Sequence, residues 1–124
     1  MAGRPRVVVT GLGLVTPLGV GVGAVWRRLI EGGCGIRNLP SLHGLPSEIG
    51  APVPRGSGEA EFDASRHRLL APGDDKSMSA FIHFALAAAG EALDSAGWQP
   101  ATEAERQRTG VAIGSGIGSL QVCR

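Results

Sequence analysis

The hydrophobic positions near the start of the chain form an uncharged run in which apolar and polar residues do not alternate. The run begins with Val7-Val8-Val9 and continues into Gly11, Gly13 and Pro17, so turn formers follow the β-branched residues. A strand that is buried on both faces lacks alternation, whereas a half-buried strand shows it. The run therefore predicts a buried strand at residues 7–9 that leads through a glycine-bent loop into a helix.

A short amphipathic helix is predicted over residues 24–31, where apolar positions recur at helical spacing. Its expected buried stripe consists of Val25, Trp26, Leu29 and Ile30. Gly32-Gly33 follows, and glycine suits the left-handed position that commonly ends a helix. Residues 33–75 then hold five prolines and few clustered apolar residues, which predicts an irregular excursion with a short strand around 48–53 and a helical turn around 64–70.

A longer helix is predicted from Lys76 to about Ala96, because apolar residues again recur at helical spacing. The apolar face comprises Met78, Ile82, Ala85, Ala89, Leu93 and Ala96, widened by Phe81, Leu86 and Ala88. The polar strip comprises His83, Gly90, Glu91 and Asp94, and Gly97 with Pro100 ends the helix. Residues 109–113 then predict a second buried strand, followed by a second glycine-bent loop at 114–119.

Composition narrows the functional classes. The chain has 124 residues, of which 43% are hydrophobic and 4% aromatic, as expected for one domain with an aliphatic core. Twelve basic and eleven acidic residues give a net charge of +1, so neither a nucleic acid nor an anionic membrane is expected as a partner. Residues 7–26 carry no charge, but five glycines and Pro17 interrupt them, which argues against a membrane span. A secretory signal remains an alternative for this segment, whereas its strand-like pattern argues against the basic amphipathic helix of a mitochondrial presequence.

No complete catalytic set or cofactor motif is visible. The spacing of Gly11 and Gly13 fails the dinucleotide fingerprint because Thr16 stands where the third glycine belongs, and no Gly-Lys-Ser/Thr follows the loop at 114–119. Cys34 and Cys123 lack a metal-ligand spacing, so free thiols are expected, with no metal and no cofactor.

Three histidines, His43, His67 and His83, could serve a nucleophile as a base, but a structural role is expected for each. Ile117 stands between glycines, where a β-branched residue either fills the core of the domain or lines an apolar pocket or interface.

Taken together, these segments resemble the N-terminal part of the β-ketoacyl-acyl-carrier-protein synthases, the condensing enzymes of fatty-acid elongation. In chain order, the matching pieces are Arg6-Val7-Val8-Val9-Thr10-Gly11-Leu12-Gly13, Thr16-Pro17-Leu18-Gly19, Trp26 and Leu29 with Gly32 and Gly35-Ile36, Lys76-Ser77-Met78-Ser79, Asp94-Ser95-Ala96-Gly97 and Gly110-Val111-Ala112-Ile113-Gly114-Ser115-Gly116-Ile117-Gly118. Features similar to the mitochondrial branch are Pro54-Arg55-Gly56-Ser57, Lys76-Ser77-Met78-Ser79 and Gly97-Trp98 with Pro100.

The resemblance implies an α/β, thiolase-like fold, of which residues 1–124 would supply the first part of the N-terminal half, with 33–75 as an excursion. It implies decarboxylative condensation of an acyl thioester with a malonyl carrier protein, in a homodimer. Gly116 and Ile117 match positions at the acyl tunnel, and Lys76 matches a basic position that contacts the acyl carrier protein, although Asp75 and Ser77 replace basic neighbours. A solvated role for Lys76 remains open.

The family's nucleophilic cysteine and two histidines lie downstream of every matched piece. The chain is therefore expected to be a fragment without catalytic residues and inactive alone. The alternative is a non-catalytic interface or binding module, and a secreted or membrane-tethered domain is a third hypothesis. The expected location is the mitochondrial matrix, with the bacterial cytoplasm as the alternative.

Overall fold

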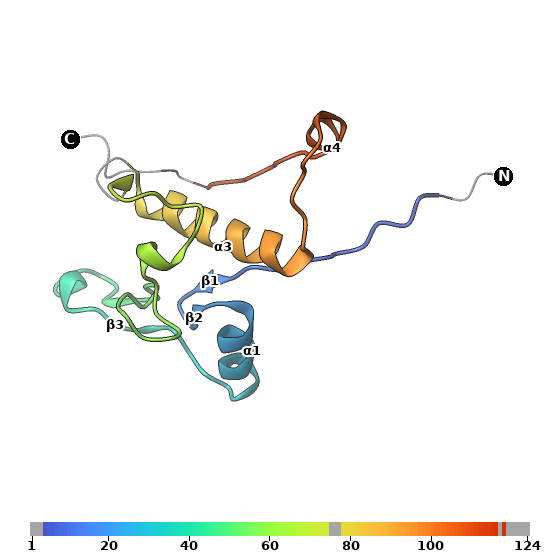
Figure 1. Ribbon diagram of the computed structural model, residues 1–124. Helices are drawn as coiled ribbons and strands as arrows, with labels where there is room; N and C mark the ends of the chain where they lie inside the picture. The colour runs from blue at the N-terminus through green and yellow to red at the C-terminus, as the bar shows by residue number, and fades with distance from the viewer. Residues whose placement is uncertain (1–3, 75–77, 117, 119–124) are drawn as a thin grey trace.

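The computed structural model describes residues 4–74, 78–116 and 118, and helices with small antiparallel sheets make up the architecture (Figure 1). The α-helices are α1 (Val22–Ile30), α3 (Ala80–Ala96) and α4 (Glu103–Gln107). The strands are β1 (Val15–Thr16) paired with β2 (Gly19–Val20), and β3 (Arg37–Asn38) paired with β4 (Ile49–Gly50). Two 3₁₀ turns, η1 (Pro40–Leu42) and η2 (Ala64–Arg66), lie in the segment between α1 and α3.

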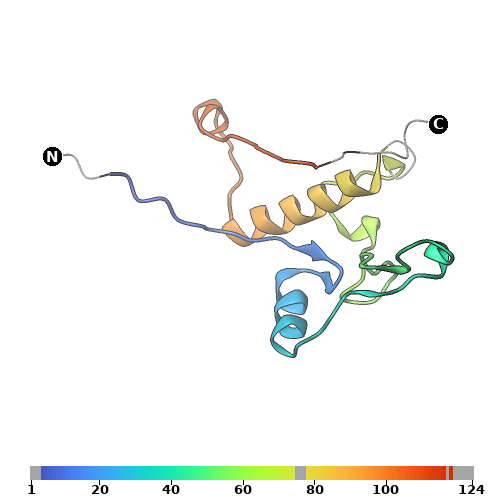
Figure 2. The ribbon, with the colours of Figure 1, turned by 180° about the vertical axis from the view of Figure 1, so that it is seen from behind.

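The β1–β2 hairpin lies between the two longer helices, with β1 in contact with α3 and β2 in contact with α1 (Figure 1). The segment that contains β3, β4 and η2 lies toward the N-terminal end of α3, and α4 lies toward the other end (Figure 2). The hairpin is therefore the junction through which the N-terminal third of the chain meets the central helix.

Both longer helices end at left-handed glycines, as the sequence predicts. Gly32 follows α1 with φ 75°, and Gly97 caps α3 with φ 62°. The short strand predicted around 48–53 and the helical turn predicted around 64–70 are also confirmed, by β4 and η2. Helix α3 begins at Ala80, later than the predicted Lys76, because the backbone of Ser79 is extended.

The core of the described chain is small. Its buried hydrophobic residues are Val25, Phe62 and Ala87. Phe62 is the centre of an aromatic cluster, in which Phe84 contacts it edge to face at 4.9 Å between ring centroids and His67 stacks on it at 5.2 Å. The guanidinium of Arg55 lies 5.8 Å from the centroid of the Phe62 ring and 5.2 Å from that of the Phe84 ring, within the range of cation–π attraction.

The glycines after the first hydrophobic run lie directly against the backbone of α3. A Cβ atom at Gly11 would lie 2.1 Å from the carbonyl oxygen of Ala92, and one at Gly13 would lie 1.9 Å from that of Ala88. No side chain fits into that space. The side chains on this face of α3 are alanines, which are small enough for the loop backbone to contact the helix backbone.

Three of the predicted burial patterns are wrong in the described structure. Residues 7–9 and 111–113 form no strand, and Val7 and Val111 are 91% and 84% exposed. Only Val25 of the predicted α1 stripe is buried, whereas Trp26 is 61% exposed and Leu29 and Ile30 are also exposed. The reason is the same in these three cases, because no other described segment covers these side chains. The predicted faces of α3 are wrong as well, since His83 and Gly90 of the expected polar strip are buried and Phe81 of the expected apolar face is exposed. The physical reason is that Leu69 packs beside Gly90 and the carbonyl group of Asp74 lies beside His83, so the preceding segment covers that side of the helix. None of the helices that the structure describes has the length and hydropathy to span a membrane.

Candidate functional site

The structure describes one of the three residues that the resemblance assigns to a site. Gly116 is exposed, and a Cβ atom there would meet no atom within 4 Å. Ile117 and Lys76 lie outside the described residues. The assignments to an acyl pocket and to a carrier-protein contact therefore stay predictions.

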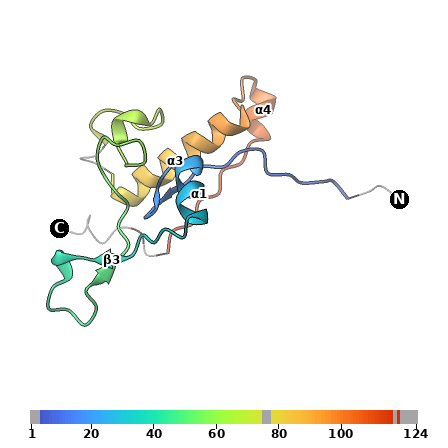
Figure 3. The ribbon, with the colours of Figure 1, turned by 90° about the horizontal axis from the view of Figure 1, so that it is seen from below.

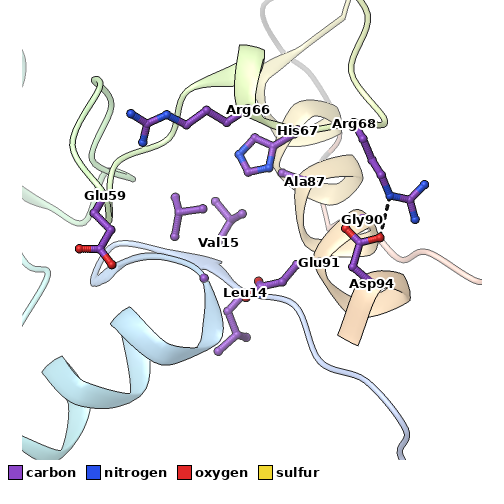
Figure 4. Close-up of a pocket in the computed structure, with 12 residues that line it drawn as sticks. Leu14, Val15, Glu59, Arg66, His67, Arg68, Ala87, Gly90, Glu91 and Asp94 are labelled. Carbon is purple, nitrogen blue, oxygen red and sulfur yellow. Dashed lines mark hydrogen bonds and ion pairs between the residues drawn. The ribbon is translucent and has the colours of Figure 1, made fainter. Parts of the chain in front are cut away.

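The described residues form a cavity of about 340 Å³ between the β1–β2 hairpin, the η2 segment and α3 (Figure 4). Apolar atoms from the hairpin and from Ala87 and Gly90 of α3 line its floor. Polar side chains line its rim, namely the charged Glu59, Arg66, Arg68, Glu91 and Asp94 and the imidazole of His67.

Glu91 fastens the hairpin to α3. One carboxylate oxygen, Oε2, accepts a hydrogen bond from the backbone N–H of Leu14 at 2.9 Å, and the other, Oε1, accepts one from Val22 at 2.7 Å. The N–H of Val22 belongs to the first turn of α1, where the N-cap residue Gly21 offers no side-chain acceptor. A carboxylate at this end of a helix also opposes the positive end of the helix dipole. Glu91 of α3 thus caps the N-terminus of α1.

The arginines on the rim are already paired. Nε of Arg68 donates to Asp94 at 2.8 Å, an ion pair drawn in Figure 4. Arg66 donates to the carbonyl oxygens of Ser57 and Gly58, the second at 2.9 Å, and so ties η2 to the preceding loop. Both guanidinium groups therefore hold chain segments together at the mouth of the cavity.

His67 has a pKa that this environment shifts. Burial lowers its pKa below the ordinary value, and the carboxylates of Asp63 and Glu91 oppose that effect. Asp63 itself accepts hydrogen bonds from the N–H and hydroxyl of Ser65, which hold its pKa below the ordinary value. The neutral imidazole is therefore favoured at the edge of the cavity, stacked on Phe62.

The residues that line the cavity offer carboxylates, guanidinium groups and an imidazole. Its lining residues in the described part of the chain include no serine, threonine or cysteine. Cys34 is exposed and lines a separate cavity of about 170 Å³ with Arg28 and Arg37. Among residues 4–74, 78–116 and 118, no three histidine, cysteine or acidic side chains gather as a metal site would require.

The other two histidines lie apart from this cavity. His43 is exposed and pairs with Glu48 at 3.2 Å. His83 is buried, with Nε2 at 3.2 Å from the carbonyl oxygen of Asp74. His67, His83 and Cys34 thus line three different cavities of the described chain. Sequence reasoning missed the role of Glu91, and its only local signal is an acidic residue within an alanine-rich helix.

Comparison with known proteins identifies the protein family to which the chain belongs. A family model described as "Beta-ketoacyl synthase, N-terminal domain" matches residues 4–123. The chain belongs to this family, which confirms the resemblance in the sequence motifs.

Individual relatives agree with that assignment. The chain is 46% identical over 131 residues to the mitochondrial 3-oxoacyl-[acyl-carrier-protein] synthase of Arabidopsis thaliana, and the match covers 93% of this chain and 27% of the relative. It is 42% identical over 118 residues to a putative mitochondrial synthase of Schizosaccharomyces pombe, with 93% and 27% covered. It is 40% identical over 119 residues to 3-oxoacyl-[acyl-carrier-protein] synthase 2 of Rhizobium meliloti, with 94% and 28% covered. The chain therefore spans little more than a quarter of the length of these curated relatives.

Proposed function

We propose that this chain acts as the N-terminal part of a 3-oxoacyl-[acyl-carrier-protein] synthase, in a thiolase-like α/β fold. The observation that carries the proposal is the family match over residues 4–123, together with relatives that bear this name. In the proposed reaction, an acyl group passes from its carrier thiol to an enzyme cysteine, with release of the carrier thiol. A malonyl carrier protein then loses CO₂, and the resulting carbanion attacks the acyl thioester, which returns the cysteine as the leaving group.

The chain's own contribution is substrate binding rather than bond making. Gly116 and Ile117 would lie at the acyl chain, and Lys76 would contact the acidic carrier protein. The nucleophile and the histidines would come from polypeptide beyond the matched region, in a homodimeric enzyme. The relatives named as mitochondrial support a mitochondrial matrix location, with a bacterial cytoplasm as the alternative.

A chimera tests the proposed activity. In the Arabidopsis synthase, the matched portion is replaced by this chain, and formation of the 3-oxoacyl product from acyl and malonyl carrier proteins is measured. We expect the chimera to condense the substrates and the 124-residue chain alone to give no product. A folded chimera without activity contradicts the proposal. Product from the chain alone that Cys34→Ala abolishes would also contradict it, because the nucleophile would then lie in this chain.

Ile117→Phe in the same chimera tests the acyl pocket. The larger side chain would overpack a narrow apolar tunnel, which typically costs about 1–3 kcal/mol, so long acyl substrates should lose more kcat/KM than short ones. Ile49→Phe is the matched control, since Ile49 is 59% exposed on β4. Equal loss for short and long substrates would place Ile117 in the core or at an interface instead.

A further inference from the structure

His83 is a buried polar residue on an otherwise small and uncharged face of α3. It is 5% exposed, and it shares the buried face of the helix with Ala87 and Gly90, which follow at helical spacing. A buried polar group costs free energy unless it is hydrogen-bonded, so an apolar side chain would fill this position at lower cost. The imidazole is therefore explained by the hydrogen bond that it makes.

The hydrogen bond of His83 joins α3 to the segment that precedes it. Nε2 lies 3.2 Å from the carbonyl oxygen of Asp74, and because a carbonyl group only accepts, the ring nitrogen is the donor. The same oxygen accepts the backbone N–H of Met78 at 2.8 Å. One carbonyl oxygen, with both of its lone pairs in use, thus connects Asp74 and Met78 to the helix.

Asp74 is also fixed to the turn on its N-terminal side. Its Oδ2 accepts the backbone N–H of Ala71 at 2.7 Å, and its own N–H donates to the carbonyl oxygen of Ala71 at 3.2 Å. Further back, Leu69 packs beside Gly90, so the segment that follows η2 lies beside α3 (Figures 1 and 3). The bond from His83 holds the C-terminal end of that segment on the helix.

The position of this bond bears on partner binding. Residues 75–77 lie outside the described residues, and they include Lys76, which the resemblance matches to a basic contact with the acyl carrier protein. The described residues on either side, Asp74 and Met78, are the two that the shared carbonyl oxygen connects to α3. Ordering a segment at the moment of binding costs entropy, and anchoring its ends beforehand lowers that cost.

We propose that His83 is a positioning residue for the acyl carrier protein, because it holds the carbonyl group of Asp74 on α3 and so sets where Lys76 meets that partner. His83 itself contacts neither the substrate nor the carrier protein. The inference rests on the proposed function and deepens it, since it names a residue that governs the affinity for one partner and takes no part in bond making.

A double-mutant cycle in the chimera with the Arabidopsis synthase tests this role. Lys76→Ala and His83→Leu should each raise KM for the acyl carrier protein substrate by about tenfold and leave kcat within about twofold of the wild type. The double variant should show no more than the effect of Lys76→Ala alone, because His83 acts through that residue. His83→Gln keeps a side-chain N–H donor and should restore the wild-type KM.

Two further variants complete the cycle. His43→Leu is the matched control, since His43 is an exposed histidine in the loop before β4, and it should change neither constant. His83→Asn keeps an amide on a side chain too short to reach the carbonyl oxygen of Asp74, and it replaces His83→Leu in the cycle if that variant does not fold.

The outcomes separate this inference from the proposed function. Additive effects in the double variant, or a loss of kcat with an unchanged KM, would overturn the inference, because a merely structural role of His83 predicts them. An active chimera in which Lys76→Ala leaves KM unchanged would overturn it while the proposed function stands. An inactive chimera refutes the proposed function, and the same cycle is then decided by the dissociation constants of the carrier protein, measured by surface plasmon resonance.

Discussion

Substitution of Gly13 by alanine tests the contact between the N-terminal loop and α3. The added Cβ atom would lie 1.9 Å from the carbonyl oxygen and 2.8 Å from the carbonyl carbon of Ala88, and 2.9 Å from the amide nitrogen of Ala92. Ordinary carbon–oxygen contacts are more than 3 Å, so the loop and the helix must separate by roughly 1.5 Å. All three atoms belong to the helix backbone, and no rotamer change can relieve the clash.

The expected loss of stability follows from the rigidity of the two backbone segments in contact. Overpacking typically costs about 1–3 kcal/mol, and because neither side can relax we expect Gly13→Ala to lower the free energy of unfolding by about 3 kcal/mol. Gly23→Ala is the matched control, since Gly23 lies in α1 and a Cβ atom there meets nothing within 4 Å. Gly23→Ala should raise the free energy of unfolding by about 0.5–1 kcal/mol, because alanine has a higher helix propensity than glycine. Urea unfolding followed by far-ultraviolet circular dichroism measures both, and a Gly13→Ala protein as stable as the wild type would refute the contact.

Three further changes probe the polar groups. Glu91→Leu leaves two backbone amides without their acceptor and should lower the free energy of unfolding by about 2–3 kcal/mol; no loss in urea unfolding would contradict the capping role. Because the folded state lowers the pKa of His67 below 6.5, the unfolded state binds more protons there, so stability should fall as pH drops through and below that value. His67→Leu should flatten this pH dependence and His43→Leu should retain it. Thr102→Ala removes the side-chain hydroxyl, one of three hydrogen-bonding groups that lower the pKa of Glu105, and leaves the backbone N–H groups of residues 101 and 102 in place; that pKa should therefore rise slightly in an NMR titration, and an unchanged value would argue against the side-chain part of the capping box.

The two longer helices and their C-terminal ends could be predicted from local sequence, whereas α4, the β1–β2 hairpin and the cavity could not. Gly32 and Gly97 mark the helix ends because a left-handed cap depends on neighbouring residues only. A hydrophobic run such as residues 7–9 indicates that burial is needed, but the covering segment can lie anywhere in the sequence, and no described segment provides it. Glu91 belongs to the same class of long-range feature, because its two partners lie 77 and 69 residues away. Nothing near Glu91 in the sequence indicates that it accepts their hydrogen bonds.

The bond between Glu91 and Leu14 also sets an order of events during synthesis. A ribosome adds residues from the N-terminus, so Leu14 is made 77 residues before its acceptor. At roughly 5–20 residues per second, that interval lasts about 4–15 s. Throughout it, the β1–β2 hairpin has neither its carboxylate acceptor nor the surface of α3 on which Gly13 rests. The nascent hairpin segment must therefore stay unaggregated, without the surface on which it packs, until α3 is made, which makes this the interval in which a chaperone that binds apolar segments would be most useful.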